Sequence, residues 1–343
     1  MAGALYNVNL NKLCSMLNLG EMRSDPKALS GGLLHRMFAV ETTQGKYAVK
    51  ALNPQIMARP KALQNTIHSE RIANAAARSD IPALPAKQFY GESIQRVDDQ
   101  YYLVFDWVEG RSLTHDDVHP SHCETIGGIL ADIHMTDFSM LEVERDLQDE
   151  TTLADWHFYL QQGKESGSVW VDLMAETIDQ LYDWNARAGK AARELASHTV
   201  ICHGDLDSKN VMWRGDQPIL IDWEAAGYVN PMQNLAETAM HWSQDEDGTL
   251  DKDRFIAFLR GYRNRSGTIQ ADWSTVLDQG PAGMLGWLEY NLKRSLWIEC
   301  TDEAEQRLGT NEVITALNAL KRYDDQRSEI EQWLNEGSRG SVT

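Results

Sequence analysis

The hydrophobic pattern of the first hundred residues predicts short strands crossed by one long helix. Apolar and polar residues alternate in brief runs bounded by turn residues, which is typical of strands. The expected strands are 35–41, 46–51, 88–90 and 101–105, after a short helix around 10–17. Pro60 opens a helix that should run to about Ala77, because proline is favoured in the first helical turn.

From residue 106 onward, apolar residues recur at helical spacing. Helices are expected near 121–136, 170–195, 232–243, 252–264, 282–300 and 310–335, and one compact β-type passage, 199–222, interrupts them. We place the boundary near 105–110, where Gly110 supplies a flexible backbone. The sequence therefore predicts an α+β protein with two lobes, a small β-rich lobe over 1–105 and a larger, mostly helical lobe over 106–343.

The composition is that of an ordinary globular protein, with 42% hydrophobic and 24% charged residues among 343. No run approaches the ~20 apolar residues of a membrane span, and the first residues lack the layout of a secretory signal. A cytoplasmic protein without a membrane partner is expected. The cysteines are far apart and form no CxxC pair, so we expect free thiols. They are Cys14, Cys123, Cys202 and Cys300.

The charge is unevenly distributed along the chain. The net charge of −19 argues against nucleic acid as a partner, because phosphate backbones need basic surface. Residues 1–105 carry 12 basic and 8 acidic side chains, a net of +4, whereas residues 106–343 carry 20 and 43, a net of −23. This asymmetry fits a first part that meets an anion and a second part that meets a cation, although solubility alone also explains an acidic excess.

The passage 200–224, VICHGDLDSKNVMWRGDQPILIDWE, carries the strongest chemical signal. Asp205 can accept a proton from an attacking hydroxyl. The amide oxygen of Asn210 and the carboxylate of Asp222 suit Mg²⁺, which prefers oxygen ligands. The spacing His-x-Asp-x-x-x-x-Asn, from His203 to Asn210, is that of a kinase catalytic loop. A structural alternative is that Asp205 and Asn210 only cap a turn, but it does not explain Asp222 after an apolar strand.

Two upstream elements complete a predicted phosphate site. Lys50 ends the strand Tyr47-Ala48-Val49-Lys50, as does the lysine that grips nucleotide phosphates in kinases. Glu70, on the following helix, is its expected partner, although a solvated strand-end lysine is the alternative. Ser30, Gly31 and Gly32 would let the backbone approach phosphates closely, a weak signal that gains weight from its position before the lysine strand.

Taken in their order along the chain, these motifs resemble those of the aminoglycoside phosphotransferase and choline kinase family. Its members are protein-kinase-like enzymes that act on small molecules. The matching segments, which run over nearly the whole chain, are LSGGL at 29–33, YAVK at 47–50, VFDWVEG at 104–110, LADIH at 130–134, HGDLDSKN at 203–210 and IDWE at 221–224. The resemblance implies a bilobed kinase-like fold with a small antiparallel sheet. It also implies that ATP or GTP binds against Phe105, Asp106, Trp107 and Val108, and that His203 braces the catalytic loop.

The sequence departs from the family pattern at three positions. His35 stands where the family often has Asn, Asp207 where His or Gln is common, and Asn234 where Asp is usual. None of these changes removes a catalytic group. We expect Mg²⁺-dependent transfer of a γ-phosphoryl group to the hydroxyl of a small molecule, with Asp205 as the base.

The acidic second part favours a cationic acceptor, such as an aminoglycoside or another basic antibiotic. Its candidate contacts are Asp205, Asp207, Glu224 and Glu289, the last of which shares its segment with Trp287 and Tyr290. A metabolic kinase for choline, ethanolamine, homoserine or a sugar amine is the alternative. A nucleotide-binding pseudokinase is a further one, against which the intact set of Lys50, Asp205, Asn210 and Asp222 argues.

Overall fold

The computed structural model describes residues 6–29, 35–141, 154–300 and 302–339. The chain forms two compact units. Unit 1 consists of Met1–Asp117, Met135–Glu144 and Ile201–Gly227, and unit 2 consists of Val118–His134, Arg145–Val200 and Tyr228–Thr343. The predicted catalytic passage therefore packs with the N-terminal residues. The lobe boundary that we expect near 105–110 stays a prediction.

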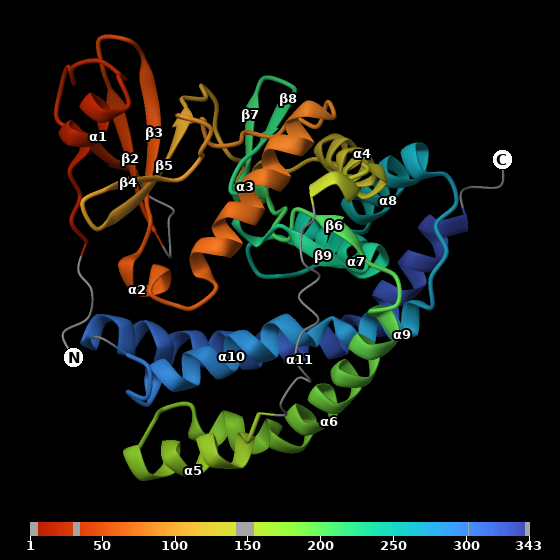
Figure 1. Ribbon diagram of the computed structural model, residues 1–343. Coiled ribbons are helices and arrows are strands. Elements are labelled where there is room, and N and C mark those ends of the chain that lie inside the picture. Colours follow the sequence, from red (N-terminus) through yellow and green to blue (C-terminus); the bar gives the residue numbers. More distant parts are fainter. Residues whose placement is uncertain (1–5, 30–34, 142–153, 301, 340–343) are drawn as a thin grey trace. The chain divides into compact units, whose positions relative to one another are not determined.

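Unit 1 is built on a five-stranded sheet of order β1-β2-β3-β5-β4, in which every neighbouring pair is antiparallel (Figure 1). Its strands are β1 Lys27–Leu29, β2 Arg36–Glu41, β3 Lys46–Ala51, β4 Gln95–Val97 and β5 Gln100–Asp106. The short helix α1 Leu10–Met16 buries Leu13 against Val40, Val49 and Val104 of this sheet. These elements confirm the small antiparallel sheet that the sequence predicts.

The strand expected at 88–90 is wrong. Phe89 and Glu92 instead exchange backbone hydrogen bonds of 2.9 and 3.0 Å across a tight turn. Tyr90 has a φ of 55° and Gly91 a φ of 86°, and such left-handed backbone ends a strand. The fourth strand, β4, lies a few residues later and pairs Gln95 with Tyr102 of β5.

The helix predicted from Pro60 is α3, Ala62–Arg78, preceded by the short α2, Pro54–Met57. The segment after α3 is tied to the catalytic passage: Leu84 N donates to Leu220 O at 2.8 Å, and Leu220 N donates to Pro82 O at 2.7 Å. The passage itself contains β6 Val200–Cys202, η3 Ser208–Asn210, β7 Val211–Arg214, β8 Gln217–Leu220, η4 Trp223–Ala225 and β9 Gly227–Val229. Two further 3₁₀ turns are η1 His115–Asp117 and η2 Ser139–Leu141.

Unit 2 is helical. Its helices are α4 Pro120–Met135, which ends one residue beyond the unit, α5 Trp156–Ser166, α6 Val171–Leu195, α7 Pro231–Ser243, α8 Lys252–Ser266, α9 Trp273–Gln279, α10 Pro281–Ser295 and α11 Glu303–Arg339. Six of them match the helices expected from periodicity. The sequence missed α5 and α9, which are short. It also overextended α10, because Trp297 adopts a φ of 60° and the chain leaves the helix.

Tryptophan rings form much of the core of unit 2. Trp156, Trp170 and Trp184 pack with Leu288 of α10 and Leu317 of α11. Large rings dominate core energetics because each removes a large apolar area from water. Cys14, Cys123 and Cys202 are buried free thiols, and Cys300 is a free thiol at intermediate exposure. Within the described residues, no helix combines the length and hydrophobicity needed to cross a membrane.

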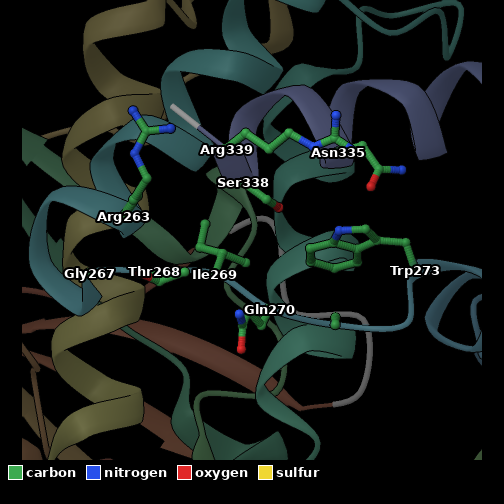
Figure 2. A pocket seen from close by; sticks show the side chains of 10 residues that line it. Arg263, Gly267, Thr268, Ile269, Gln270, Trp273, Asn335, Ser338 and Arg339 are labelled. Carbon is green, nitrogen blue, oxygen red and sulfur yellow. The ribbon is translucent and has the colours of Figure 1, made fainter. Parts of the chain in front are cut away.

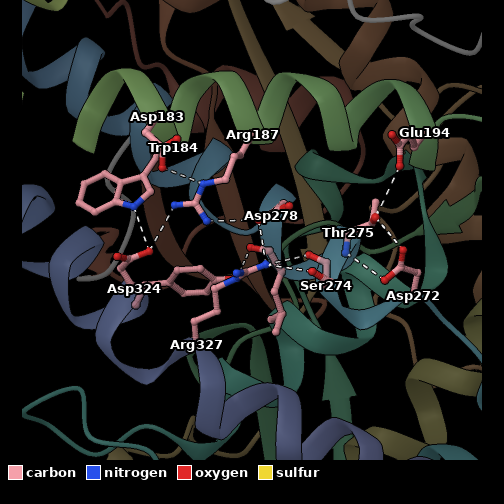
Figure 3. A network of polar contacts seen from close by, with 12 residues as sticks. Asp183, Trp184, Arg187, Glu194, Asp272, Ser274, Thr275, Asp278, Asp324 and Arg327 are labelled. Atoms are coloured by element: carbon pink, nitrogen blue, oxygen red, sulfur yellow. Dashed lines mark hydrogen bonds and ion pairs between the residues drawn. The ribbon is translucent and has the colours of Figure 1, made fainter. Parts of the chain in front are cut away.

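A network of charged side chains joins α6, α9 and α11 (Figure 3). Arg187 of α6 lies 3.0 Å from Asp183, 3.3 Å from Asp278 and 3.4 Å from Asp324. Arg327 of α11 approaches Asp278 to 2.8 Å. The acids come from three helices, so the two guanidinium groups hold together elements that are distant in sequence.

We expect Arg187→Met to lower the free energy of unfolding by about 1–3 kcal/mol, because the acids would lose a partly buried partner while the aliphatic packing is kept. Urea denaturation followed by circular dichroism measures this. Lys190→Met on the same helix is the control, since Lys190 is 75% exposed and lies 3.9 Å from Glu194. Its effect should stay within about 0.5 kcal/mol, and equal effects of the two variants would contradict a structural role for the network.

Unit 2 contains a histidine that is buried among polar partners. His134 contacts Tyr262 Oη through Nδ1 at 2.9 Å and Asn234 Oδ1 through Nε2 at 3.0 Å. Burial lowers its pKa to about 4, against a smaller opposing effect of the Asn234 hydrogen bond. The unfolded chain, in which a histidine has a pKa of about 6.5, therefore binds the proton first as the pH falls.

We predict that His134 contributes a loss of stability as the pH is lowered from about 6.5 to about 4, by up to about 3 kcal/mol. His134→Gln should show a shallower decline over this range than the wild type. His157→Gln, at an exposed histidine of α5, should keep the wild-type slope. Urea unfolding at several pH values gives the slopes, and parallel curves for wild type and His134→Gln would refute the prediction.

Candidate active site

The β7–β8 hairpin brings Asn210 and Asp222 to the same end of one small sheet. Val211 pairs with Leu220 in the antiparallel register, and Ile221 N donates to Asn210 O at 2.9 Å. Asn210 precedes β7 and Asp222 follows β8 after one residue, so both residues belong to the open end of the hairpin, opposite the turn at 215–216. The predicted convergence of these two oxygen donors is consistent with this register.

The loop before β7 is held by its own polar side chains. Asn210 Nδ2 donates to Asp205 O and to Asp205 Oδ2, both at 2.8 Å, which leaves the amide oxygen of Asn210 as the atom that a cation could use. The Asp205 carboxylate is 42% exposed and lies 3.4 Å from Lys209 Nζ. An accessible carboxylate with a fixed orientation can accept a proton from a hydroxyl.

His203 lies beneath this loop and is fully buried. Asp205 N donates to its Nδ1 at 3.3 Å, and its Nε2 lies 3.1 Å from Ile221 O. Because Nδ1 accepts, the proton belongs on Nε2, which donates to the carbonyl. Burial lowers the pKa of His203 to about 4, despite the opposing effect of the hydrogen bond to Ile221. A neutral histidine fixed in this way joins the loop to Ile221, the residue before Asp222, and the bracing role that the resemblance implies for it stays a prediction.

Lys50 is almost completely buried, with 9% of its side chain exposed, and it faces two carboxylates. Its Nζ lies 2.7 Å from Asp222 Oδ1 and 2.9 Å from Glu224 Oε2. Burial alone would lower the pKa of this ammonium, but Asp222 and Glu224 outweigh burial and raise it. Asp222 has a φ of 61°, a left-handed backbone that Asp tolerates better than most residues. Lys50 is therefore an inward-facing cation, as expected from its strand.

The expected pairing of Lys50 with Glu70 is not what the structure contains. Glu70 Oε2 accepts a hydrogen bond from Ala86 N at 2.8 Å. Burial raises the pKa of Glu70 to about 7, and the Ala86 hydrogen bond and the charge of Lys50 oppose this only in part. The partner of Lys50 was misassigned because Asp222 and Glu224, more than 170 residues away in sequence, reach the ammonium through tertiary packing.

Sequence reasoning missed the part that His35 plays in this cluster. His35 Nε2 lies 3.3 Å from Glu224 Oε2, and its Nδ1 accepts a hydrogen bond from Asn53 N at 2.9 Å. The pKa of Glu224 falls to about 2, because His35 and Lys50 outweigh the raising effect of burial. The departure from Asn at position 35 was the available signal, but its contact could not be read from the sequence.

The residues predicted to flank the nucleotide lie at the end of β5 and just after it. Phe105 and Asp106 close β5, opposite Ala48 and Tyr47 of β3. Trp107 N donates to Lys46 O at 3.3 Å, and the Lys46 ammonium lies 3.6 Å from the centre of the Trp107 ring. Val108 follows without regular structure. Ser30, Gly31 and Gly32 lie outside the described residues.

A family model described as "Phosphotransferase enzyme family" matches residues 25–267, which is more than half of the chain. The chain belongs to this phosphotransferase family. It is accordingly a small-molecule kinase. The matched range includes Lys50, the HGDLDSKN loop and Asp222, the residues on which the resemblance depends.

Curated relatives of this phosphotransferase are homoserine kinases. The protein of Methylobacillus flagellatus is 23% identical over 275 residues, which cover 79% of this chain and 80% of the relative. The protein of Methylorubrum populi is 25% identical over 250 residues, covering 71% and 72%. Both identities are low, so the name homoserine kinase describes those proteins and is not transferred to this chain.

Solved structures confirm the kinase-like fold. A spectinomycin phosphotransferase in complex with ADP and spectinomycin superposes with a TM-score of 0.67 at 11% identity, covering 93% of this chain and 99% of that one. An ethanolamine kinase of Plasmodium vivax gives a TM-score of 0.58 at 17% identity, covering 92% and 86%. At such identities the likeness concerns the fold of the phosphotransferase alone.

The acids predicted to contact an acceptor already have partners in the phosphotransferase. Asp207 Oδ2 lies 2.6 Å from Lys209 Nζ. Glu224 is engaged by Lys50 and His35, as described above. In unit 2, Glu289 accepts from Tyr159 Oη at 2.9 Å and lies 3.2 Å from Lys293 Nζ. Their assignment to the acceptor stays a prediction, and the local charge available to a cation is smaller than a count of acids indicates.

Unit 2 also contains a cavity of about 880 Å³ between the chain after α8 and the end of α11 (Figure 2). Its lining consists of Arg263, Gly267, Thr268, Ile269, Gln270, Ala271, Trp273, Asn335, Ser338 and Arg339. None of the residues predicted for phosphoryl transfer line it. We therefore assign this cavity no part in the reaction.

We predict that Gly204→Ala disrupts the catalytic loop. Gly204 has a φ of +84°, and a Cβ there would lie 2.1 Å from Ala225 O. Gly215→Ala in the β7–β8 turn is a matched control, because Gly215 also has a positive φ, of +59°, but no atom lies within 4 Å of its Cβ position. Gly204→Ala should destabilise the protein by about 1–3 kcal/mol more than Gly215→Ala, as measured by thermal unfolding. Equal losses would show that the close approach to Ala225 is unimportant.

Proposed function

We propose that this phosphotransferase moves the γ-phosphoryl group of ATP or GTP to the hydroxyl of a small, amino-bearing molecule, and that it works with Mg²⁺. The observation that supports this most is the buried Lys50 ammonium 2.7 Å from the Asp222 carboxylate, with Asn210 tied to the residue before Asp222 by the backbone bond from Ile221 N to Asn210 O. Lys50 binds the phosphates and Asp205 accepts the proton of the attacking hydroxyl. Such catalysis consists mainly of positioning and charge stabilisation.

The donor set fits a magnesium ion. Asp222 offers a carboxylate and Asn210 an amide oxygen, and hard oxygen ligands of this kind are those that Mg²⁺ takes together with substrate phosphates. When bound, the ion supplies positive charge to the phosphate oxygens. The residues of the chain orient the base. Asn210 holds Asp205 through two hydrogen bonds of 2.8 Å, and the buried His203 accepts a hydrogen bond from Asp205 N.

The acceptor is proposed from two observations. The net charge of −23 over residues 106–343 favours a cationic molecule such as an aminoglycoside or another basic antibiotic. The internal pairing of Asp207, Glu224 and Glu289 weakens that argument for a polycation. Homoserine, which carries one amino group and one hydroxyl, is the second candidate, and the names of the curated relatives favour it.

The decisive experiment incubates the full-length protein with Mg²⁺ and ATP or GTP, and with a panel of acceptors: homoserine, ethanolamine, choline, spectinomycin and an aminoglycoside. Coupled detection of ADP or GDP measures turnover, and mass spectrometry identifies the compound that gains one phosphoryl group. We expect one acceptor class to respond. Nucleotide binding without product from any acceptor, and without slow ATP hydrolysis, would favour the pseudokinase alternative.

Asp205→Asn should lower turnover of the responding acceptor by about 10²–10⁴-fold, because the amide cannot accept the proton. Asp216→Asn is the control, since Asp216 lies exposed in the β7–β8 turn of the same hairpin and should retain activity within about twofold. Unfolding temperatures establish that both variants are folded. An Asp205→Asn enzyme with wild-type turnover would refute the assignment of the base.

A further inference from the structure

Each of the two ring nitrogens of His35 makes its own polar contact. Its side chain is 10% exposed, and it lies immediately before β2. Asn53, the N-cap of α2, donates its backbone N–H to Nδ1 at 2.9 Å. Since Nδ1 accepts, the neutral ring carries its proton on Nε2, and Nε2 is the atom that lies 3.3 Å from Glu224. His35 therefore donates to the carboxylate.

Glu224 receives two donors on a single oxygen. Its Oε2 lies 2.9 Å from Lys50 Nζ and 3.3 Å from His35 Nε2. Lys50 is shared in turn with Asp222 at 2.7 Å. The contacts thus form a chain of hydrogen bonds from Asn53 through His35, Glu224 and Lys50 to Asp222, all within unit 1.

This chain has a consequence for nucleotide binding. If Lys50 turns to the phosphates and Asp222 to a metal ion, then Glu224 loses its ammonium partner. Among the described residues, His35 is then the donor that remains in contact with Glu224. A carboxylate left without a donor beside a triphosphate would repel it, because like charges at close range are costly in a partly buried site.

We propose that His35 is a positioning residue for phosphoryl transfer, which holds the Glu224 carboxylate in place so that Lys50 can exchange its carboxylate partners for nucleotide phosphates. The proposal rests on the proposed function of this site. It also gives a physical meaning to the departure at position 35, where the resembling family often has Asn. An asparagine amide reaches only as far as Nδ1 of histidine and not as far as Nε2.

A purely structural role is the alternative, in which His35 serves only to fix the start of α2 through Asn53. Two substitutions separate these roles. The amide nitrogen of Gln lies as many bonds from Cα as Nε2 does and can reach the same place, so His35→Gln keeps a donor for Glu224 and loses the acceptor for Asn53. The amide oxygen of Asn corresponds to Nδ1, so His35→Asn keeps the acceptor and loses the donor.

The kinetic test compares the two variants with the wild type and with His198→Asn, a control at an exposed histidine of unit 2. We expect His35→Asn to raise the KM for nucleotide about tenfold, the size of effect associated with losing one charge-assisted hydrogen bond, while kcat changes much less. His35→Gln should lie closer to the wild type. The reverse order, or equal losses in both variants, would overturn the proposal.

A spectroscopic test needs no turnover. In the ligand-free protein, ¹⁵N-detected imidazole correlations should show His35 as the Nε2–H tautomer, and Glu224→Gln should shift its Nε2 signal while His198 stays unchanged. An Nδ1–H tautomer, or an unshifted signal, would overturn the proposal. Calorimetric titration with ADP and Mg²⁺ measures the Kd of the nucleotide for His35→Asn and for His35→Gln. His35→Asn should bind more weakly than His35→Gln. If the tautomer, the signal shift and the Kd order are all found but no acceptor is phosphorylated, the proposed transfer reaction fails and the placement of His35 stands.

Discussion

The ion pairs between the Lys50 ammonium and the carboxylates of Asp222 and Glu224 hold the polar site of unit 1 together. An ammonium that has lost nearly all of its water is expensive unless opposite charges compensate it, and here two carboxylates do so at 2.7 and 2.9 Å. One short segment supplies both acids, which are two residues apart in the sequence. The left-handed backbone of Asp222 forms a turn at this point. The lysine strand and the catalytic passage are thereby joined through charge, and the segment after α3 is joined to the same passage through the backbone bonds between Pro82–Leu84 and Leu220.

The same charge balance restricts what can bind. A ligand that draws Lys50 away must supply anionic oxygens, because the ammonium would otherwise remain buried without a partner. Its arrival leaves Asp222 and Glu224 as two neighbouring negative charges, which are costly unless a cation or a donor compensates them. A nucleotide triphosphate that carries a divalent ion meets both requirements together, whereas an anion without a metal meets only the first.

The parts of the site that follow from local pattern could be predicted from the sequence. An apolar strand with Lys50 on its buried face and the β7–β8 hairpin between Asn210 and Asp222 both depend on neighbouring residues and turn chemistry. The partner of Lys50 could not be predicted, because Glu70 and Glu224 are equally suitable acids and only tertiary packing selects between them. The false strand at 88–90 has a local cause, since Tyr90 adopts a left-handed conformation that is uncommon for a bulky residue.

Recognition of the acceptor illustrates a further gap between sequence and structure. A sequence shows how many acids a region contains, but a cation is attracted by acids whose charge is not already neutralised nearby. Asp207 lies 2.6 Å from Lys209, and Glu289 lies 3.2 Å from Lys293, so each has a basic partner close by in the sequence. Asp205 is paired less closely, because the same Lys209 ammonium lies 3.4 Å from it, and 42% of its side chain is exposed. Under the proposed function, the carboxylate that accepts the proton would thus also be the most exposed of the four candidate acids, which would couple the choice of acceptor to the chemistry itself.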